Sequence, residues 1–196
     1  MLVKFLKGLV KVVLFPFFRV KLYNVENFNK STGKCIVCSN HISNFDPVML
    51  MIYTKRHINF MAKKELFDVF FIKNVLKYIG AFPVDRDKPS LSTIKGALSI
   101  LKNGEVLGIF PEGTRVNEYN EENAKSGIAL IANKGDANII PIFIKSSYKI
   151  FSKVEIFFGK PKKYFQNFEG KVTSAQYREV SKEMLRDIYS LEKEVN

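Results

Sequence analysis

Short apolar segments that alternate with helical patterns constrain the fold of this chain most strongly. Residues 106–110 (VLGIF) form one such segment, bounded by Asn103-Gly104 and by Pro111. An unbroken apolar run of this length is typical of a parallel strand buried on both faces. By the same criteria we expect strands at residues 19–26, 33–39, 58–62, 81–84, 138–144 and 153–158, and helices at residues 48–53, 69–78, 91–102, 123–134 and after a cap at Thr173 or Ser174. The alternation predicts a single α/β domain with a mostly parallel central sheet flanked by helices.

The composition indicates one globular domain with a basic surface. The chain has 196 residues, of which 46% are hydrophobic, and this is enough for a sizeable core. Its 31 Lys and Arg residues exceed its 19 Asp and Glu residues, which gives a net charge of +12. Such an excess favours a polyanionic partner, either nucleic acid or an anionic membrane surface. Because the chain has 18 Phe and no Trp, whereas nucleic-acid binders favour exposed Tyr and Arg, we expect a lipid surface and no nucleic acid.

The two cysteines, Cys35 and Cys38, have the C-x-x-C spacing of redox and zinc sites. On a strand these two positions point to opposite faces of the sheet. The chain has no second cysteine pair that would complete a zinc site. We therefore expect no metal here, and two packing residues in a reducing compartment.

Residues 1–18 predict an amphipathic helix, and residues 19–196 form the rest of the domain. On a helix, Lys4, Lys7 and Lys11 fall within a narrow arc and apolar residues occupy nearly all the remaining surface. The uncharged run is far shorter than the roughly 20 residues of a spanning helix. This pattern favours a helix that lies in the membrane interface, and so a peripheral protein on the cytoplasmic face of the cell membrane. The alternative is a helix packed on the core with its lysines in water.

A histidine and a carboxylate follow the predicted strand at 33–39. His41 lies in the turn after this strand, and Asp46 precedes Pro47, which suits the first position of a helix. We therefore expect Asp46 to cap that helix, and the loop to fold back so that the carboxylate orients the imidazole as a general base. On these residues alone a second interpretation stays open, in which Asp46 only caps a helix and His41 only occupies a loop.

Two further loops follow predicted strands and carry arginines. Arg86 comes after the strand at 81–84, and residues 112–115 (EGTR) come after the strand at 106–110. The carboxyl ends of parallel neighbouring strands meet at one edge of a sheet, where ligands bind. Two guanidinium groups beside His41 would form a clamp for phosphate or carboxylate. The alternative is that Arg86 and Arg115 only form surface ion pairs with nearby acidic residues.

Four segments resemble the conserved blocks of the glycerolipid acyltransferases. Residues 40–46 (NHISNFD) match the N-H-x-S-x-x-D block, which contains the His-x4-Asp motif, and residues 80–86 (GAFPVDR) are similar to a block with Gly followed six residues later by Arg. Residues 110–115 (FPEGTR) match the third block letter for letter, and residues 140–142 (IPI) resemble the fourth. The order and spacing are family-like across residues 35–145. Pro83 departs from the pattern, which usually has an aliphatic residue there.

The resemblance implies transfer of a fatty acyl group from a thioester to the sn-2 hydroxyl of a lysophosphatidic acid. His41 would act as the general base and Asp46 would orient it and stabilise the imidazolium. Arg86 and Arg115 would hold the acceptor phosphate, with Gly113 and Thr114 shaping the adjacent turn. This chemistry needs no cofactor, no metal and no covalent acyl-enzyme, and the chain has no G-x-S-x-G motif that would form one.

Some assignments stay open at this point. Glu112 binds the glycerol part of the acceptor or anchors Arg115, and Lys63 and Lys125 contact phosphate or are ordinary solvated lysines. The donor is an acyl-carrier protein or acyl-CoA. The acceptor alternatives are a lyso-ornithine lipid or a lysophospholipid, and a rival function is a basic membrane- or nucleic-acid-binding module without catalysis.

Overall fold

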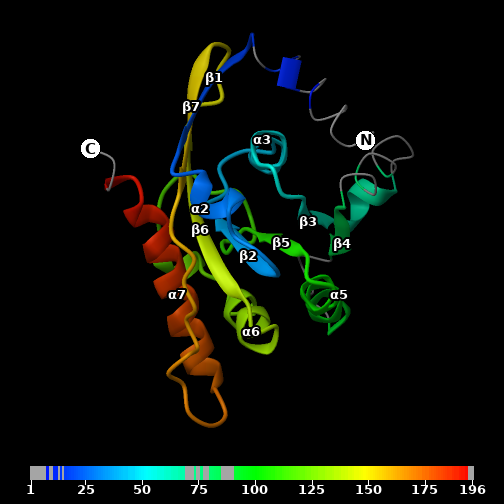
Figure 1. The fold of residues 1–196 in the computed structure, drawn as a ribbon, viewed down its shortest axis with the longest axis vertical. Helices are drawn as coiled ribbons and strands as arrows, with labels where there is room; N and C mark the ends of the chain where they lie inside the picture. The colour runs from blue at the N-terminus through cyan, green and yellow to red at the C-terminus, as the bar shows by residue number, and fades with distance from the viewer. Residues whose placement is uncertain are drawn as a thin grey trace.

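The computed structural model describes residues 8, 11, 12, 14, 16–68, 73, 76, 80–84 and 91–193. Within these residues, seven strands form one sheet in the order β1-β7-β6-β2-β5-β3-β4 (Figure 1). The strands are β1 (Phe18–Tyr23), β2 (Cys35–Ser39), β3 (Ile58–Lys63), β4 (Phe82–Val84), β5 (Val106–Ile109), β6 (Asn138–Ser146) and β7 (Ser152–Phe158). All described neighbours pair in parallel except β6 and β7, which are antiparallel. The predicted α/β domain with a mostly parallel sheet is confirmed.

Helices cover both faces of this sheet. They are α2 (Glu26–Asn29), α3 (Asp46–Tyr53), α5 (Leu91–Lys102), α6 (Gly127–Lys134) and α7 (Ser174–Ser190), with 3-10 turns η1 (Lys64–Phe67) and η2 (Glu121–Asn123). One face packs against α5, α6 and α7, with buried residues such as Leu101, Ile128 and Leu185. The other face packs against α2 and α3, with Phe28 and Leu50 among its buried residues. Both faces of the central strands are therefore buried, as their apolar sequences predict.

Several predicted boundaries differ from the structure. The strand expected at 19–26 ends at Tyr23, because Asn24 adopts a positive φ of 56° and α2 follows. The helix expected at 123–134 begins only at Gly127, because η2 and an extended residue, Ala124, precede it. The helix after Thr173 is confirmed, and Thr173 forms a capping box with Gln176. The helix expected at 69–78 lies largely outside the described residues.

The two cysteines lie where strand geometry predicts. Both are buried and free. Cys35 packs with the cluster under α3, whereas Cys38 packs with the cluster under α5, α6 and α7. Burial raises the pKa of both thiols. No group of three or more His, Cys, Asp or Glu residues within the described part of the chain is arranged to hold a metal ion.

The predicted N-terminal helix lies largely outside the described residues. Residues 8, 11, 12 and 14 are helical, and Lys11 and Val12 are exposed. Leu14 packs against the core cluster under α3. None of the helices described in the chain has the length and apolar character of a membrane span.

Gly108 in β5 allows aromatic rings to stack beneath the carboxyl edge of the sheet. A Cβ atom on Gly108 would lie 2.8 Å from Cγ2 of Ile58 and closer still to the Phe60 ring. We expect Gly108→Ala to lower the free energy of unfolding by about 1–3 kcal/mol, because this packed core cannot absorb the methyl group. Gly127→Ala is the control, because nothing lies within 4 Å of its Cβ position, and it should leave the urea midpoint unchanged or slightly raised. Equal midpoints for both variants would contradict this account.

Candidate active site

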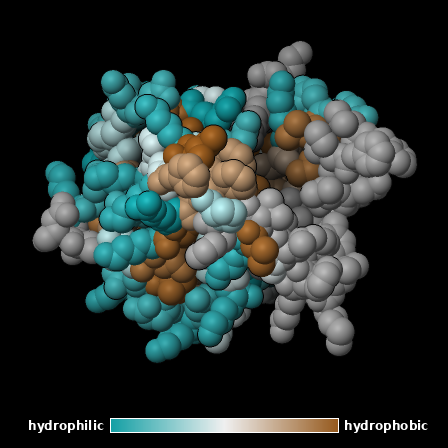
Figure 2. Space-filling view, turned by 90° about the horizontal axis from the view of Figure 1, so that it is seen from above, coloured by the Kyte–Doolittle hydropathy of each residue, from teal (hydrophilic) through white to brown (hydrophobic). Residues whose placement is uncertain are grey.

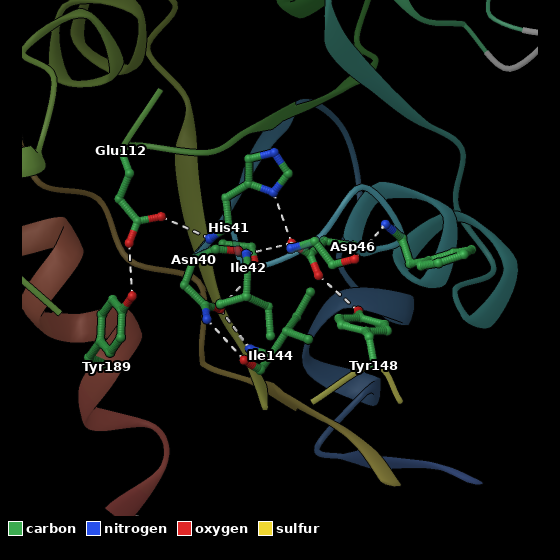
Figure 3. A network of polar contacts seen from close by, with 11 residues as sticks. Asn40, His41, Ile42, Asp46, Glu112, Ile144, Tyr148 and Tyr189 are labelled. Atoms are coloured by element: carbon green, nitrogen blue, oxygen red, sulfur yellow. Dashed lines mark hydrogen bonds and ion pairs between the residues drawn. The ribbon is translucent and has the colours of Figure 1, made fainter. Parts of the chain in front are cut away.

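The Asp46 carboxylate is the centre of a buried polar network at the carboxyl edge of the sheet (Figure 3). Its Oδ2 atom accepts hydrogen bonds from Nδ1 of His41 at 2.8 Å and from the backbone N–H groups of Ile42 and Ser43 at 2.8 and 2.7 Å. Its Oδ1 atom accepts from the hydroxyl of Tyr148 at 2.8 Å. Asp46 is fully buried and His41 is 4% exposed. The loop therefore folds back as predicted and brings the carboxylate to the imidazole.

Asp46 does not cap α3 as we predicted. It is the first residue of the helix, the preceding Phe45 has a helical backbone, and no side chain caps this end. The reason is that the Asp46 carboxylate turns backwards and accepts the amides of the loop that precedes the helix. Pro47 consequently occupies the second helical position rather than the first, which it tolerates because it has no N–H group to be satisfied.

The hydrogen bond to Asp46 fixes the tautomer of His41. A carboxylate can only accept, so Nδ1 carries a proton, and in the neutral imidazole the lone pair is then on Nε2, on the far side of the ring. The imidazole stacks on Phe110, with ring centroids 4.1 Å apart and an interplanar angle of 16°. Phe110 in turn stacks on Phe60 at 5.6 Å. His41 and Phe110 line a cavity of about 90 Å³ together with Met61, Val84, Ile109 and Gly113.

The backbone around His41 is held from both sides. The Asn40 side chain donates to the carbonyl of Ile144 at 2.9 Å and accepts from the Ile144 N–H at 2.7 Å. The side chain thereby replaces the backbone hydrogen bonds by which β2 pairs with β6. The His41 carbonyl accepts from the N–H of Val116 at 2.8 Å. The His41 N–H donates to Oε2 of Glu112 at 2.8 Å. These contacts hold the loop after β2 against β6 and against the loop after β5, the strands that flank β2 in the parallel part of the sheet.

Glu112 supports the site from within the protein. It is 2% exposed, and its second oxygen accepts from the hydroxyl of Tyr189 on α7 at 2.8 Å. Burial raises the pKa of Glu112 to about 7, partly offset by the hydrogen bonds from Tyr189 and the His41 backbone. Because both oxygens already accept internal donors, the structure favours a positioning role over the two roles that we predicted, a contact with the acceptor or an anchor for Arg115.

The other predicted residues lie around this edge. Gly113 has a φ of 71° and lines the cavity, and Thr114 and Arg115 after it are exposed. A Cβ atom on Gly113 would lie 3.4 Å from Cγ of Lys125, whose N–H donates to the Pro111 carbonyl at 2.9 Å. The structure thus brings Lys125 beside the predicted turn.

Lys63 is less directly connected to the site. Lys63 ends β3, a neighbour of β5, and its exposed Nζ lies 3.5 Å from Oε1 of Glu65. Arg86 lies outside the described residues, so its place in a phosphate clamp stays a prediction.

Tyr148 and Tyr189 are supporting residues that our sequence analysis missed. Tyr148 lies 102 positions from Asp46, and Tyr189 lies 77 positions from Glu112. Burial and the adjacent carboxylates raise the pKa of both phenols, so both stay hydrogen-bond donors. No local sequence pattern predicts this role, because each tyrosine contacts its carboxylate only through the tertiary fold.

Comparison with known proteins identifies the family. A sequence model of the family described as Acyltransferase matches residues 19–145. The chain belongs to the Acyltransferase family. It is 38% identical over 164 residues to the 1-acyl-sn-glycerol-3-phosphate acyltransferase of Bacillus subtilis, covering 81% of each chain. It is 33% identical to the protein of the same name from Streptococcus pneumoniae, covering 70% of this chain and 52% of the relative.

A solved structure supports the fold assignment. The crystal structure of the 1-acyl-sn-glycerophosphate acyltransferase from Thermotoga maritima superposes with a TM-score of 0.70 at 22% sequence identity. The match covers 97% of this chain and 78% of the other. The α/β fold of this acyltransferase is therefore shared with that protein.

The raised pKa of Glu112 predicts a pH-dependent stability. The Glu112 carboxyl has a pKa of 4.5 in the unfolded chain and of about 7 in the folded protein, so between pH 4.5 and pH 7 the folded state holds the carboxyl proton more tightly. The protonated Glu112 carboxyl contributes its full stabilisation below pH 4.5. This contribution to the free energy of unfolding, up to about 3 kcal/mol, is lost as the pH rises through 7. Glu112→Gln cannot ionise, so its free energy of unfolding relative to wild type should increase from pH 5 to pH 8.

Urea denaturation at several pH values measures this difference. Glu118→Gln, at an exposed position in the same loop, is the control and should follow the wild-type curve. A constant difference between Glu112→Gln and wild type across this range would refute the assignment of a raised pKa to Glu112.

Proposed function

We propose that this acyltransferase transfers a fatty acyl group from an acyl thioester to the sn-2 hydroxyl of 1-acyl-glycerol-3-phosphate. The product is phosphatidic acid, and the thiol of an acyl-carrier protein or of coenzyme A is released. The observation that carries the proposal is the buried His41–Asp46 pair, with Nδ1 and Oδ2 2.8 Å apart, beside a small apolar cavity. The names of the relatives support the choice of acceptor.

The geometry suits general-base catalysis. Nε2 of His41 takes the proton of the sn-2 hydroxyl while the hydroxyl oxygen attacks the thioester carbonyl. The carbon–sulfur bond then breaks, and the thiolate leaves with the proton that His41 has taken. Asp46 stabilises the imidazolium in between, and its other three donors keep it from moving.

Exposed cations at the same edge suit the acceptor phosphate. Arg115 follows the turn at Gly113 and is exposed, and Lys125 lies beside that turn. We assign the phosphate to Arg115, with Arg86 as its expected second partner and with Lys63 and Lys125 as weaker contacts. Guanidinium groups bind phosphate through two parallel hydrogen bonds, which also fixes the orientation of the glycerol.

We also place the protein on an anionic membrane surface at the cytoplasmic face. The net charge of +12 and the lysine-bearing segment at residues 1–18 support this placement. The acceptor is itself a lipid with a single acyl chain, so a protein at the membrane meets it where it is concentrated.

Product analysis tests the reaction directly. Wild-type protein incubated with 1-acyl-glycerol-3-phosphate and either acyl-CoA or acyl-carrier protein should give phosphatidic acid, identified by mass. His41→Ala and Asp46→Asn should lose about 100-fold or more of the rate, because the base or its orientation is lost. Circular dichroism should show both variants to be folded. Full activity of folded His41→Ala would exclude the general-base mechanism.

Arg115 should act on acceptor binding more than on chemistry. We expect Arg115→Ala to raise the acceptor KM by about 10-fold or more, since it removes charge-assisted hydrogen bonds to phosphate. The matched control is Arg178→Ala, which removes an exposed arginine of α7 that pairs with Glu122. Steady-state kinetics at saturating donor separate KM from kcat. An acceptor KM that stays at the wild-type value would remove Arg115 from the phosphate site.

A further inference from the structure

Four exposed apolar side chains belong to the loop between β6 and β7, to the residue before β1 and to the loop before α3. Figure 1 shows the β6–β7 turn and the start of β1 together at one end of the molecule. Ile150 and Phe151 are 69% and 66% exposed, and Phe17 and Phe45 are 43% and 41% exposed. We name these four residues the tip patch. Figure 2, which views the molecule from this end, shows apolar side chains near the middle of the face, with hydrophilic ones mainly to their left.

Contacts join the three segments of the tip patch. The Phe151 N–H donates to the Phe17 carbonyl at 2.7 Å. The Phe45 ring lies 5.8 Å from the Tyr148 ring and 5.6 Å from the Phe18 ring. The patch is therefore a continuous surface, since three chain segments are packed against one another beneath it.

The backbone of the β6–β7 loop is held in an unusual conformation that displays Ile150 and Phe151. Tyr148 and Phe151 have φ values of 49° and 64°. Such values are unfavourable for bulky residues and persist only where surrounding contacts enforce them, typically at functional sites. Here the contacts are the hydrogen bond from Tyr148 to Asp46 and the one from Phe151 to Phe17.

Basic side chains flank the tip patch. Lys149 is exposed within the loop, and Arg19 is exposed one residue after Phe18. Apolar side chains beside Lys and Arg match the boundary between acyl chains and anionic headgroups.

We propose that the tip patch docks onto the surface of an anionic lipid bilayer, an assignment that rests on the lipid acyl transfer proposed above. Ile150 and Phe151 enter the headgroup region, and Lys149 and Arg19 contact the lipid phosphates. The same loop carries Tyr148, whose hydroxyl holds Asp46 at 2.8 Å. Docking at this surface sets the His41–Asp46 pair beside the layer that supplies the lipid acceptor.

The absence of tryptophan from the chain permits a direct experiment with the full-length protein. Phe151→Trp introduces a single tryptophan into the tip patch. Its fluorescence should shift to shorter wavelength on vesicles that contain phosphatidylglycerol, and brominated lipids should quench it. Phe168→Trp is the matched control, because it places the same ring in the loop before α7, at the opposite end of the molecule in Figure 1. Its emission should not change.

Each other outcome counts against lipid docking. Unchanged Phe151→Trp emission on vesicles would overturn it, and so would equal shifts for both variants. A shift that depends on protein concentration without vesicles would assign the tip patch to a second copy of the chain instead.

Activity separates failure of docking from failure of the proposed function. The double variant Ile150→Ser/Phe151→Asn should keep the wild-type rate with a short-chain acceptor dissolved in water, and should lose about 10-fold with the acceptor embedded in anionic vesicles. Asn is chosen because it tolerates a positive φ. Equal rates of double variant and wild type on vesicles would overturn the docking role. A wild-type protein inactive on both acceptors, with the tryptophan shift intact, would overturn the acyl transfer alone.

Discussion

The fully buried Asp46 carboxylate is the constraint on which the rest of this site depends. A buried charge is tolerated only when its hydrogen bonds are satisfied. Four donors satisfy this one: the His41 ring, two loop amides and the Tyr148 hydroxyl. The loop must fold back to supply the amides, and this same folding brings the imidazole to the carboxylate. The geometry of the His41–Asp46 pair is thus a consequence of burying one acid.

A second buried carboxylate fixes the backbone of the same histidine. Glu112 accepts the His41 N–H and the Tyr189 hydroxyl, while its raised pKa shows how unfavourable the charged form is there. Asp46 therefore orients the His41 ring and Glu112 positions its main chain. Two acids that act on different parts of one residue leave it little freedom, which is the preorganisation that the proposed general base needs.

The sequence predicts the strands of the sheet and the position of the loops that follow them at its carboxyl edge. Uninterrupted apolar runs such as residues 106–110 mark buried strands, and the rule for parallel sheets then brings His41 and Glu112 to one edge. The sequence does not predict which of several possible hydrogen-bond partners a side chain takes. Asp46 had an ordinary helix cap available, but the loop amides and the imidazole compete successfully for its oxygens. Tyr148 and Tyr189 could not be found, because nothing within a few residues of either distinguishes it from a core aromatic.

These distant tyrosines show that the candidate site is completed late in the chain. The family match ends at residue 145, yet Tyr148 lies in the next loop and Tyr189 near the end of α7. Without them each buried carboxylate would lack one donor, at a cost of about 1–3 kcal/mol apiece. Polar networks of this kind are stable when complete and unfavourable when partly satisfied. Tyr148 in the β6–β7 loop and Tyr189 in α7 are therefore structural parts of the candidate site, although the recognisable motifs all precede them.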